Sequence, residues 1–290
     1  IYVVEKPNIE LRFSYHYDSE NKGGIIGNVT LRNLLIDRSR FIFEADLATH
    51  PNVFLDYFKY LGHHQNLAFG ASGVWSQNEL PAYDSIGNTS ALFNSNYNSG
   101  GVKLQSTILQ SSTFGAELVW SSLNLKPKII GDDLRALTRI KYNNTAFKVF
   151  YKYNNLNDRF FPTRGMLIEA TATTTTKLNG KLTIADTLSL GPDELGGLLQ
   201  TSGITSVDLT INPITQISPK VSLITKARMK ISTIGSNTLN LSEYDFVGGF
   251  SPSYINSNEY YGVGIKEFGL GNYFYGRLGV QWEVFHNIYL

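Results

Sequence analysis

A hydrolase site in this chain would need a Ser/His or Asp/His pair, because the chain contains no cysteine to act as the nucleophile. A serine hydrolase of the elbow type needs Gly-x-Ser-x-Gly, which exposes the serine above a sheet. The nearest string, Gly70-Ala71-Ser72-Gly73-Val74, has its second glycine too early in the motif. We interpret it as a small-residue stretch of a strand, so the sequence predicts no catalytic residue within this chain.

The five histidines form no catalytic or metal-binding pattern. His63 and His64 are adjacent in a predicted turn, and no further ligand follows at a spacing typical of zinc sites. His286 lies in another turn, where a solvated histidine is ordinary. His16 falls on the polar face of a predicted strand, where we expect an interior side chain without a catalytic role. The sequence therefore predicts neither a metal nor a cofactor.

The overall composition excludes several further classes. A net charge of +1 without a cluster of Lys or Arg gives no basis for a nucleic-acid partner. No apolar run is long enough for a transmembrane helix. The 17 Tyr and 17 Phe residues are the main deviation from average composition. Aromatic side chains favour strands, and they also form the girdles at both rims of membrane barrels.

Any site in this chain must be positioned by β-strands that have one apolar face and one polar face. From Leu11 to Asp18 every odd position is apolar or aromatic and every even position is polar, and similar alternation returns at residues 102–108, 147–154, 221–232 and 277–284. Short polar turns separate these runs, which permits only antiparallel neighbours. We count roughly thirteen strands of about 9–13 residues, with a further one from Ile288. Longer connections are predicted at 79–98, 126–138, 177–205 and 235–257.

This pattern predicts an all-β, antiparallel transmembrane β-barrel of an outer membrane. The alternative is a soluble sandwich or lipid-binding barrel. If the aromatic faces meet lipid, a set of charged and polar side chains points into the lumen: Arg12, His16, Lys103, Lys148, Lys152, Glu169, Lys226, Arg228, Lys230, Arg277, Gln281 and Glu283. These side chains could set ion selectivity or hold a folded-in loop. We prefer the interpretation that they pair and hydrate a polar interior.

Two segments resemble known families. Residues 157–165 contain Asp158, Pro162, Arg164 and Gly165, and resemble the acidic turn followed by Pro-x-Arg-Gly of the BamA-like surface-antigen superfamily. Residues 245–250, followed by Tyr260-Tyr261-Gly262 and Gly271-Asn272-Tyr273, are similar to the region before the last barrel strands of patatin-like phospholipases from Bacteroidetes-type bacteria. Residues 15–19 and 28–33 resemble the first hairpin of the same barrel.

One position departs from the superfamily pattern. The loop that folds back into the lumen carries Val-Arg-Gly-Tyr/Phe in the superfamily, whereas the matching residues here are Val247, Gly248, Gly249 and Phe250. The superfamily arginine pairs with a carboxylate of the barrel wall, so Gly248 cannot form an equivalent lock. The departure favours the patatin-linked branch, and we expect the Gly248–Gly249 loop to control what fills the pore.

The resemblance implies a BamA-like barrel with about sixteen strands in the full protein. It implies that residues 1–8 end a POTRA-like periplasmic domain and that residues 9–290 form the barrel, with its C-terminal strands incomplete. The implied function is to anchor, and to provide a translocation path for, a patatin-like lipid hydrolase upstream of Ile1. The alternative is a porin-like channel or a protein-insertion barrel without hydrolase activity. Expected partners are outer-membrane lipids, a second copy of the chain or other outer-membrane proteins.

Overall fold

The computed structural model describes residues 7–18, 22–63, 65–83, 89–109, 111–130, 137–158, 161–184, 203–235, 243–249, 257–258, 260, 263, 266–285 and 288–289. Its strands are β1 (Ile9–Asp18), β2 (Lys22–Arg32), β3 (Ser39–Leu47), β4 (Asn52–Leu61), β5 (Leu67–Tyr83), β6 (Thr89–Ile108), β7 (Ser112–Ile130), β8 (Leu137–Asn154), β9 (Gly165–Ile184), β10 (Ile204–Ser218), β11 (Val221–Ser232), β12 (Asp245–Val247), β13 (Ser257–Asn258), β14 (Phe268–Leu270), β15 (Tyr273–Phe285) and β16 (Ile288–Tyr289).

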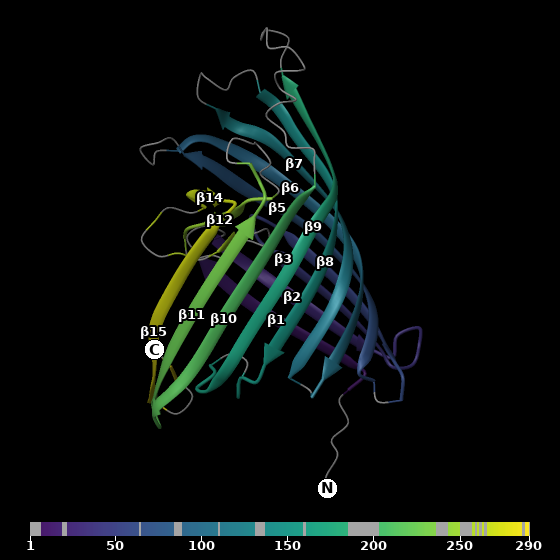
Figure 1. The fold of residues 1–290 in the computed structure, drawn as a ribbon, viewed down its shortest axis with the longest axis vertical. Coiled ribbons are helices and arrows are strands. Elements are labelled where there is room, and N and C mark those ends of the chain that lie inside the picture. The colour runs from purple at the N-terminus through teal and green to yellow at the C-terminus, as the bar shows by residue number, and fades with distance from the viewer. Residues whose placement is uncertain are drawn as a thin grey trace.

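Thirteen of these strands form one antiparallel sheet in the order β1 to β11, then β15 and β16. Each strand from β1 to β11 pairs with the next strand in sequence, β11 pairs with β15, and the sheet curves into a barrel-shaped wall (Figure 1). β12, β13 and β14 form a separate small sheet within the connection from β11 to β15. In the part of the chain that the structure describes, no ladder joins β1 to β15 or β16. The described residues include no helix with the length and apolar character needed to cross a membrane.

The antiparallel meander predicted from the alternation is confirmed, and so is a strand that begins at Ile288. The predicted strand lengths are wrong in the middle of the chain. β5 has 17 residues and β6 and β9 have 20 each. Strand therefore occupies most of the predicted connection at 79–98, parts of the one at 126–138, and residues 177–184 and 204–205 of the one at 177–205. Within the described residues, twelve strands of the large sheet precede β16, compared with the roughly thirteen predicted before Ile288.

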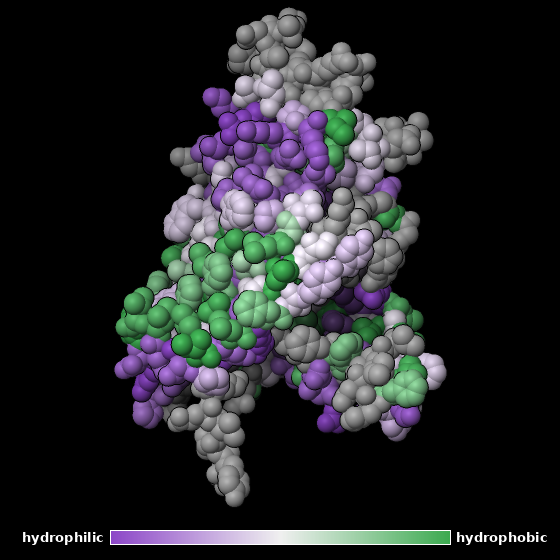
Figure 2. Space-filling model, turned by 180° about the vertical axis from the view of Figure 1, so that it is seen from behind, coloured by the Kyte–Doolittle hydropathy of each residue, from purple (hydrophilic) through white to green (hydrophobic). Residues whose placement is uncertain are grey.

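In the lower part of the wall, as oriented in Figure 1, the strands place their apolar side chains on the outer face. Phe13, Tyr15 and Tyr17 on β1 are 71–77% exposed, and Phe274 and Leu278 on β15 are 72–73% exposed. Figure 2 shows a band of hydrophobic residues with a hydrophilic region above it and a narrower hydrophilic rim below. A soluble protein rarely exposes so large a continuous apolar surface. We call this band the outer belt.

Above the outer belt, the apolar side chains of β5 to β8 change to the opposite face of the sheet. On β6, Val102 and Leu104 point outward, whereas Ala91 and Phe93 are buried on the inner face. They join an inner cluster that also contains Leu80, Leu123, Leu125, Ile140 and Tyr142. The upper part of the wall is therefore built like an ordinary protein, with its apolar side inward and its polar side toward water.

Candidate functional site

A folded-in segment lies against the inner face of the wall. It comprises the described residues of 243–270, including β12 to β14. Phe246 on β12 packs against the inner cluster of β5 to β8. Glu243 accepts hydrogen bonds from Asn144 of β8 (2.7 Å) and Thr175 of β9 (3.3 Å), and Lys266 Nζ donates to the carbonyl of Glu79 on β5 (2.9 Å). The segment therefore contacts the wall along the strands from β5 to β9.

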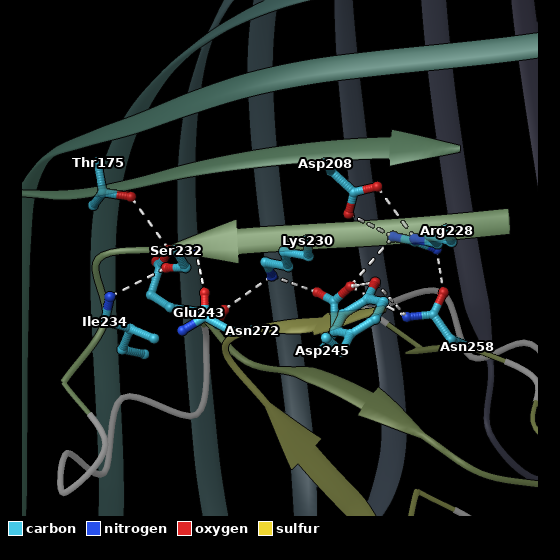
Figure 3. A network of polar contacts seen from close by, with 11 residues as sticks. Thr175, Asp208, Arg228, Lys230, Ser232, Ile234, Glu243, Asp245, Asn258 and Asn272 are labelled. Atoms are coloured by element: carbon cyan, nitrogen blue, oxygen red, sulfur yellow. Dashed lines mark hydrogen bonds and ion pairs between the residues drawn. The ribbon is translucent and has the colours of Figure 1, made fainter. Parts of the chain in front are cut away.

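Asp245 is the central anchor of this segment (Figure 3). Its carboxylate lies 2.6 Å from Lys230 Nζ and 3.2 Å from Arg228 Nη2, both on β11. Arg228 also pairs with Asp208 of β10 at 2.8 Å. The Asp245 and Lys230 side chains are only 4% and 8% exposed. Two cations of the wall thus balance two carboxylates, one from the wall and one from the segment.

Hydrogen bonds complete the coordination of this carboxylate. Tyr273 donates its hydroxyl proton to Asp245 Oδ2 at 2.6 Å, and Asn258 Nδ2 donates to the same oxygen at 3.2 Å. Arg228 donates to the side-chain oxygen of Asn258. A buried charge is tolerated only when it is paired and hydrogen-bonded, and Asp245 meets both conditions. The arrangement is a structural lock and contains no nucleophile paired with a base.

The predicted loop motif lies directly after this lock. Val247, Gly248 and Gly249 are buried, and both glycines have positive φ (135° and 79°). Gly248 N donates to the carbonyl of Asn258, and its own carbonyl accepts from Lys266 N. Phe250 lies outside the described residues. The segment is therefore anchored without an arginine at 248. The carboxylate, Asp245, lies on the segment and the cations lie on the wall, which is the reverse of the arrangement that the resemblance implied.

The sequence contained part of this information. The alternation in β11 places Arg228 and Lys230 together on the face opposite the exposed Ile231. Asp245 was quoted only as the first residue of a motif, and its role was missed. The balance of charge could have revealed this role. Two neighbouring cations that point into the interior need two carboxylates, and Asp208 on the wall supplies only one of them.

The other predicted lumen residues lie on several strands. His16 on β1 hydrogen-bonds Asp46 of β3 at 3.0 Å. Arg12 pairs with Glu10, which also pairs with Arg32 of β2. Lys226 and Arg277 are opposite each other in the ladder between β11 and β15, and Glu283 is opposite Tyr289. Arg228 and Lys230 are the predicted lumen residues that contact the folded-in segment through Asp245.

The predicted turn motif lies apart from the lock, at the end of the sheet where the N-terminus lies (Figure 1). It joins β8 to β9. Asp158 Oδ1 accepts from Phe161 N at 2.9 Å, and Asn157 Oδ1 accepts from the backbone N–H groups of Thr163 and Arg164. The carbonyl of Pro162 accepts from Gln281 on β15. The turn thus ties two separated parts of the wall together.

Gly165 is required by the geometry of this turn. Its φ is +115°, and a Cβ atom there would lie 2.6 Å from the carbonyl oxygen of Asn155. We expect Gly165→Ala to destabilise the folded barrel by about 1–3 kcal/mol, because both backbone strain and a backbone clash result. The measurement is the temperature at which the folded band disappears in gel electrophoresis. Gly276→Ala is the control, since its Cβ would meet only one atom, at 4.0 Å; equal losses in both variants would contradict the prediction.

The remaining chemical candidates do not assemble into a site. The string around Ser72 lies within β5, as its interpretation as a strand requires. Among the described residues, no group of three or more His, Asp or Glu side chains is placed to hold a metal ion. His64 and His286 lie outside the described residues.

Comparison with known proteins places the fold. No family model and no curated protein matches the chain. The structure is similar to BamA from Haemophilus ducreyi lacking POTRA domains 1–3, with a TM-score of 0.59 and 13% identity over 84% of this chain and 45% of that chain. It is also similar to CdiB from Escherichia coli, with a TM-score of 0.57 and 12% identity over 98% of this chain and 50% of that chain.

The chain thus spans about half the length of the solved structures it matches (45% and 50%). At this level of identity the likeness concerns the fold, which is a BamA-like antiparallel β-barrel.

Proposed function

We propose that this chain is the membrane-spanning barrel of a bacterial outer-membrane protein that inserts or translocates polypeptides, with the folded-in segment as its removable plug. The observation that carries the proposal is the combination of an apolar outer belt with an inner face occupied by a segment held through ions. A protein surface can face the hydrocarbon core of a membrane only where its outward side chains are apolar, so the outer belt supports a membrane location. The ionic contacts of Asp245 can be replaced by water when the segment leaves, whereas the contact of Phe246 with the inner cluster opposes its release.

A polar hollow beside the lock supports a path through the interior. It has a volume of about 410 Å³, and its lining includes Lys152, Glu169, Asp208, Arg228 and Lys230. Charged walls favour hydrated or extended polar substrates over lipid. The segment sits at one side of this hollow, so its movement would widen the interior.

The first experiment is fractionation of cells that produce the native protein. We expect it in the outer-membrane fraction after a carbonate wash, with a mobility in unheated gels that differs from that of the boiled sample. Recovery in the buffer-soluble fraction without detergent would contradict the membrane location and favour a soluble barrel.

A finer proposal concerns a linked enzyme. The resemblance of residues 245–273 to the barrels of patatin-like phospholipases supports a role as anchor of a lipid hydrolase that precedes Ile1. Intact mass and peptide mapping of the protein extracted from outer membranes test this proposal. A longer polypeptide containing a serine elbow would support it, whereas a native chain that begins close to Ile1 would leave the channel or insertion barrel as the better account.

A further inference from the structure

A groove of about 570 Å³ lies on the outer face of the wall, across β4 to β9. Its floor is formed where Gly73 of β5 and Gly100 of β6 are direct partners in the ladder. Leu55 continues this row on one side and Trp120 on the other. Two adjacent strands therefore lack a side chain in the same row of the sheet, and a large residue flanks this gap on each side.

The fold itself does not require these two glycines. Neither has a positive φ. A Cβ at Gly100 would meet only the carbonyl oxygen of Ser72, at 3.8 Å, and a Cβ at Gly73 would have its nearest contact at 3.8 Å. Glycine weakens the interior of a strand and often marks a place where another molecule approaches closely. The missing side chains create the groove.

The groove lies across the upper edge of the outer belt. In the row below it, Ala71, Val102 and Leu118 are successive partners, and all three are apolar. In the row above it, Trp75, Asn98 and Ser122 are partners, and the row continues to Asn143 and Asn179. The lining of the groove thus changes from apolar to polar over a few residues. An amphiphilic molecule has the same division into an apolar and a polar end.

We propose that this groove is a binding site for one acyl chain of a lipid with an uncharged, sugar-type headgroup. The proposal rests on the proposed membrane location. The groove opens onto the outer belt, so a neighbouring acyl chain enters it without crossing water, and its volume is typical of ligand sites. Its lining residues carry no formal charge. The amides of Asn98, Asn143 and Asn179 suit hydroxyl groups, whereas a phosphate is normally met by Arg or Lys.

Brominated acyl chains, which quench tryptophan fluorescence on contact, provide the test. Trp75 and Trp120 line the groove, and the third tryptophan, Trp282, lies on the outer face of β15 at 51% exposure. The full chain is reconstituted in phosphatidylcholine vesicles that contain a small fraction of brominated monoglucosyl diacylglycerol. The same fraction of brominated phosphatidylcholine serves as the reference lipid.

We expect stronger quenching by the glycolipid than by the reference lipid in the wild type. The double variant Gly73→Val/Gly100→Val fills the groove, and its preference is expected to fall about tenfold in relative affinity. Gly27→Val is the matched control, because Gly27 is an outward-facing glycine of β2 whose Cβ would meet only the Phe13 ring, at 3.7 Å; it should keep the preference.

Equal quenching by the two lipids in the wild type, or a preference that survives in the double variant, would overturn the proposal. A dimer detected by light scattering in detergent and lost in the double variant would also overturn it, since a second copy would then occupy the groove. Vesicles made entirely of brominated phosphatidylcholine show whether the chain inserts at all, and so distinguish an unspecific groove from a chain that is not in the membrane. If they quench no tryptophan, including Trp282, the chain does not insert, and the proposed function fails together with the groove.

Discussion

Asp245→Asn is expected to release the folded-in segment from the barrel wall and to raise the single-channel conductance in planar lipid bilayers. The substitution keeps the shape of the side chain but removes the charge that balances Lys230 and Arg228. Removal of one partner of a buried ion pair costs about 3–5 kcal/mol, because the remaining charge is left uncompensated. That cost is comparable with the total stability of many domains, so the released state should be populated.

Two further variants show whether the lock itself is responsible. Glu169→Gln breaks the pair with Lys152, whose side chains are 43% and 49% exposed. We expect this control to change stability by no more than about 1 kcal/mol and, although Glu169 lines the polar hollow, to change the conductance far less than Asp245→Asn does. Adding Lys230→Met to Asp245→Asn should restore part of the closed state, because it removes a buried, unpaired cation. Wild-type conductance and thermal stability in Asp245→Asn would show that the segment is held by other contacts.

Leu104→Arg is expected to prevent stable insertion of the barrel into lipid. Leu104 is an outward side chain of β6 within the outer belt, and it is 49% exposed. An arginine on the lipid face near the middle of the bilayer costs about 2–4 kcal/mol. The measurement is the urea concentration at which the barrel unfolds from phosphatidylcholine vesicles, together with the folded fraction at equilibrium.

Asn94→Arg is the matched control for this variant. Asn94 lies on the same strand and is an exposed residue of the polar outer face above the belt. The same arginine there remains in water, so we expect a change within about 0.5 kcal/mol. If both variants insert as well as the wild type, the outer belt is not embedded in lipid.

The belt could be read from the sequence because lipid imposes a simple rule. Most outward positions that face lipid must be apolar, so residues 11–17 alternate without interruption and residues 102–108 alternate with the single exception of Ser106. The upper halves of β5 to β8 could not be read in the same way. Their apolar side chains change to the inner face around Gly100, and this change of phase looks like the end of a strand. The predicted connection at 79–98 is the result of that misreading.

The lock shows a different limit. The alternation in β11 places Arg228 and Lys230 on the inner face, but their partner Asp245 lies beyond a long connection. No periodicity relates residues that meet only after the chain has folded back into the barrel. For the same reason, the sequence did not predict that the carboxylate would lie on the segment and the cations on the wall. Gly248 indicated only that the arginine of the superfamily pattern is missing.

The sequence by itself determined the antiparallel meander, the outward face of the belt, the inward position of the two cations and the turn that contains Gly165. These features depend on residues close together in the chain, where period and turn geometry act directly. Only the tertiary structure decided that the inner cluster is covered by Phe246, that Asp245 closes the lock and that Gly73 meets Gly100. A shift of one residue in the register of β5 and β6 would separate those two glycines, because neighbouring positions of a strand point to opposite faces. Such features are set by the register of whole strands and by long-range contacts, which no local pattern contains.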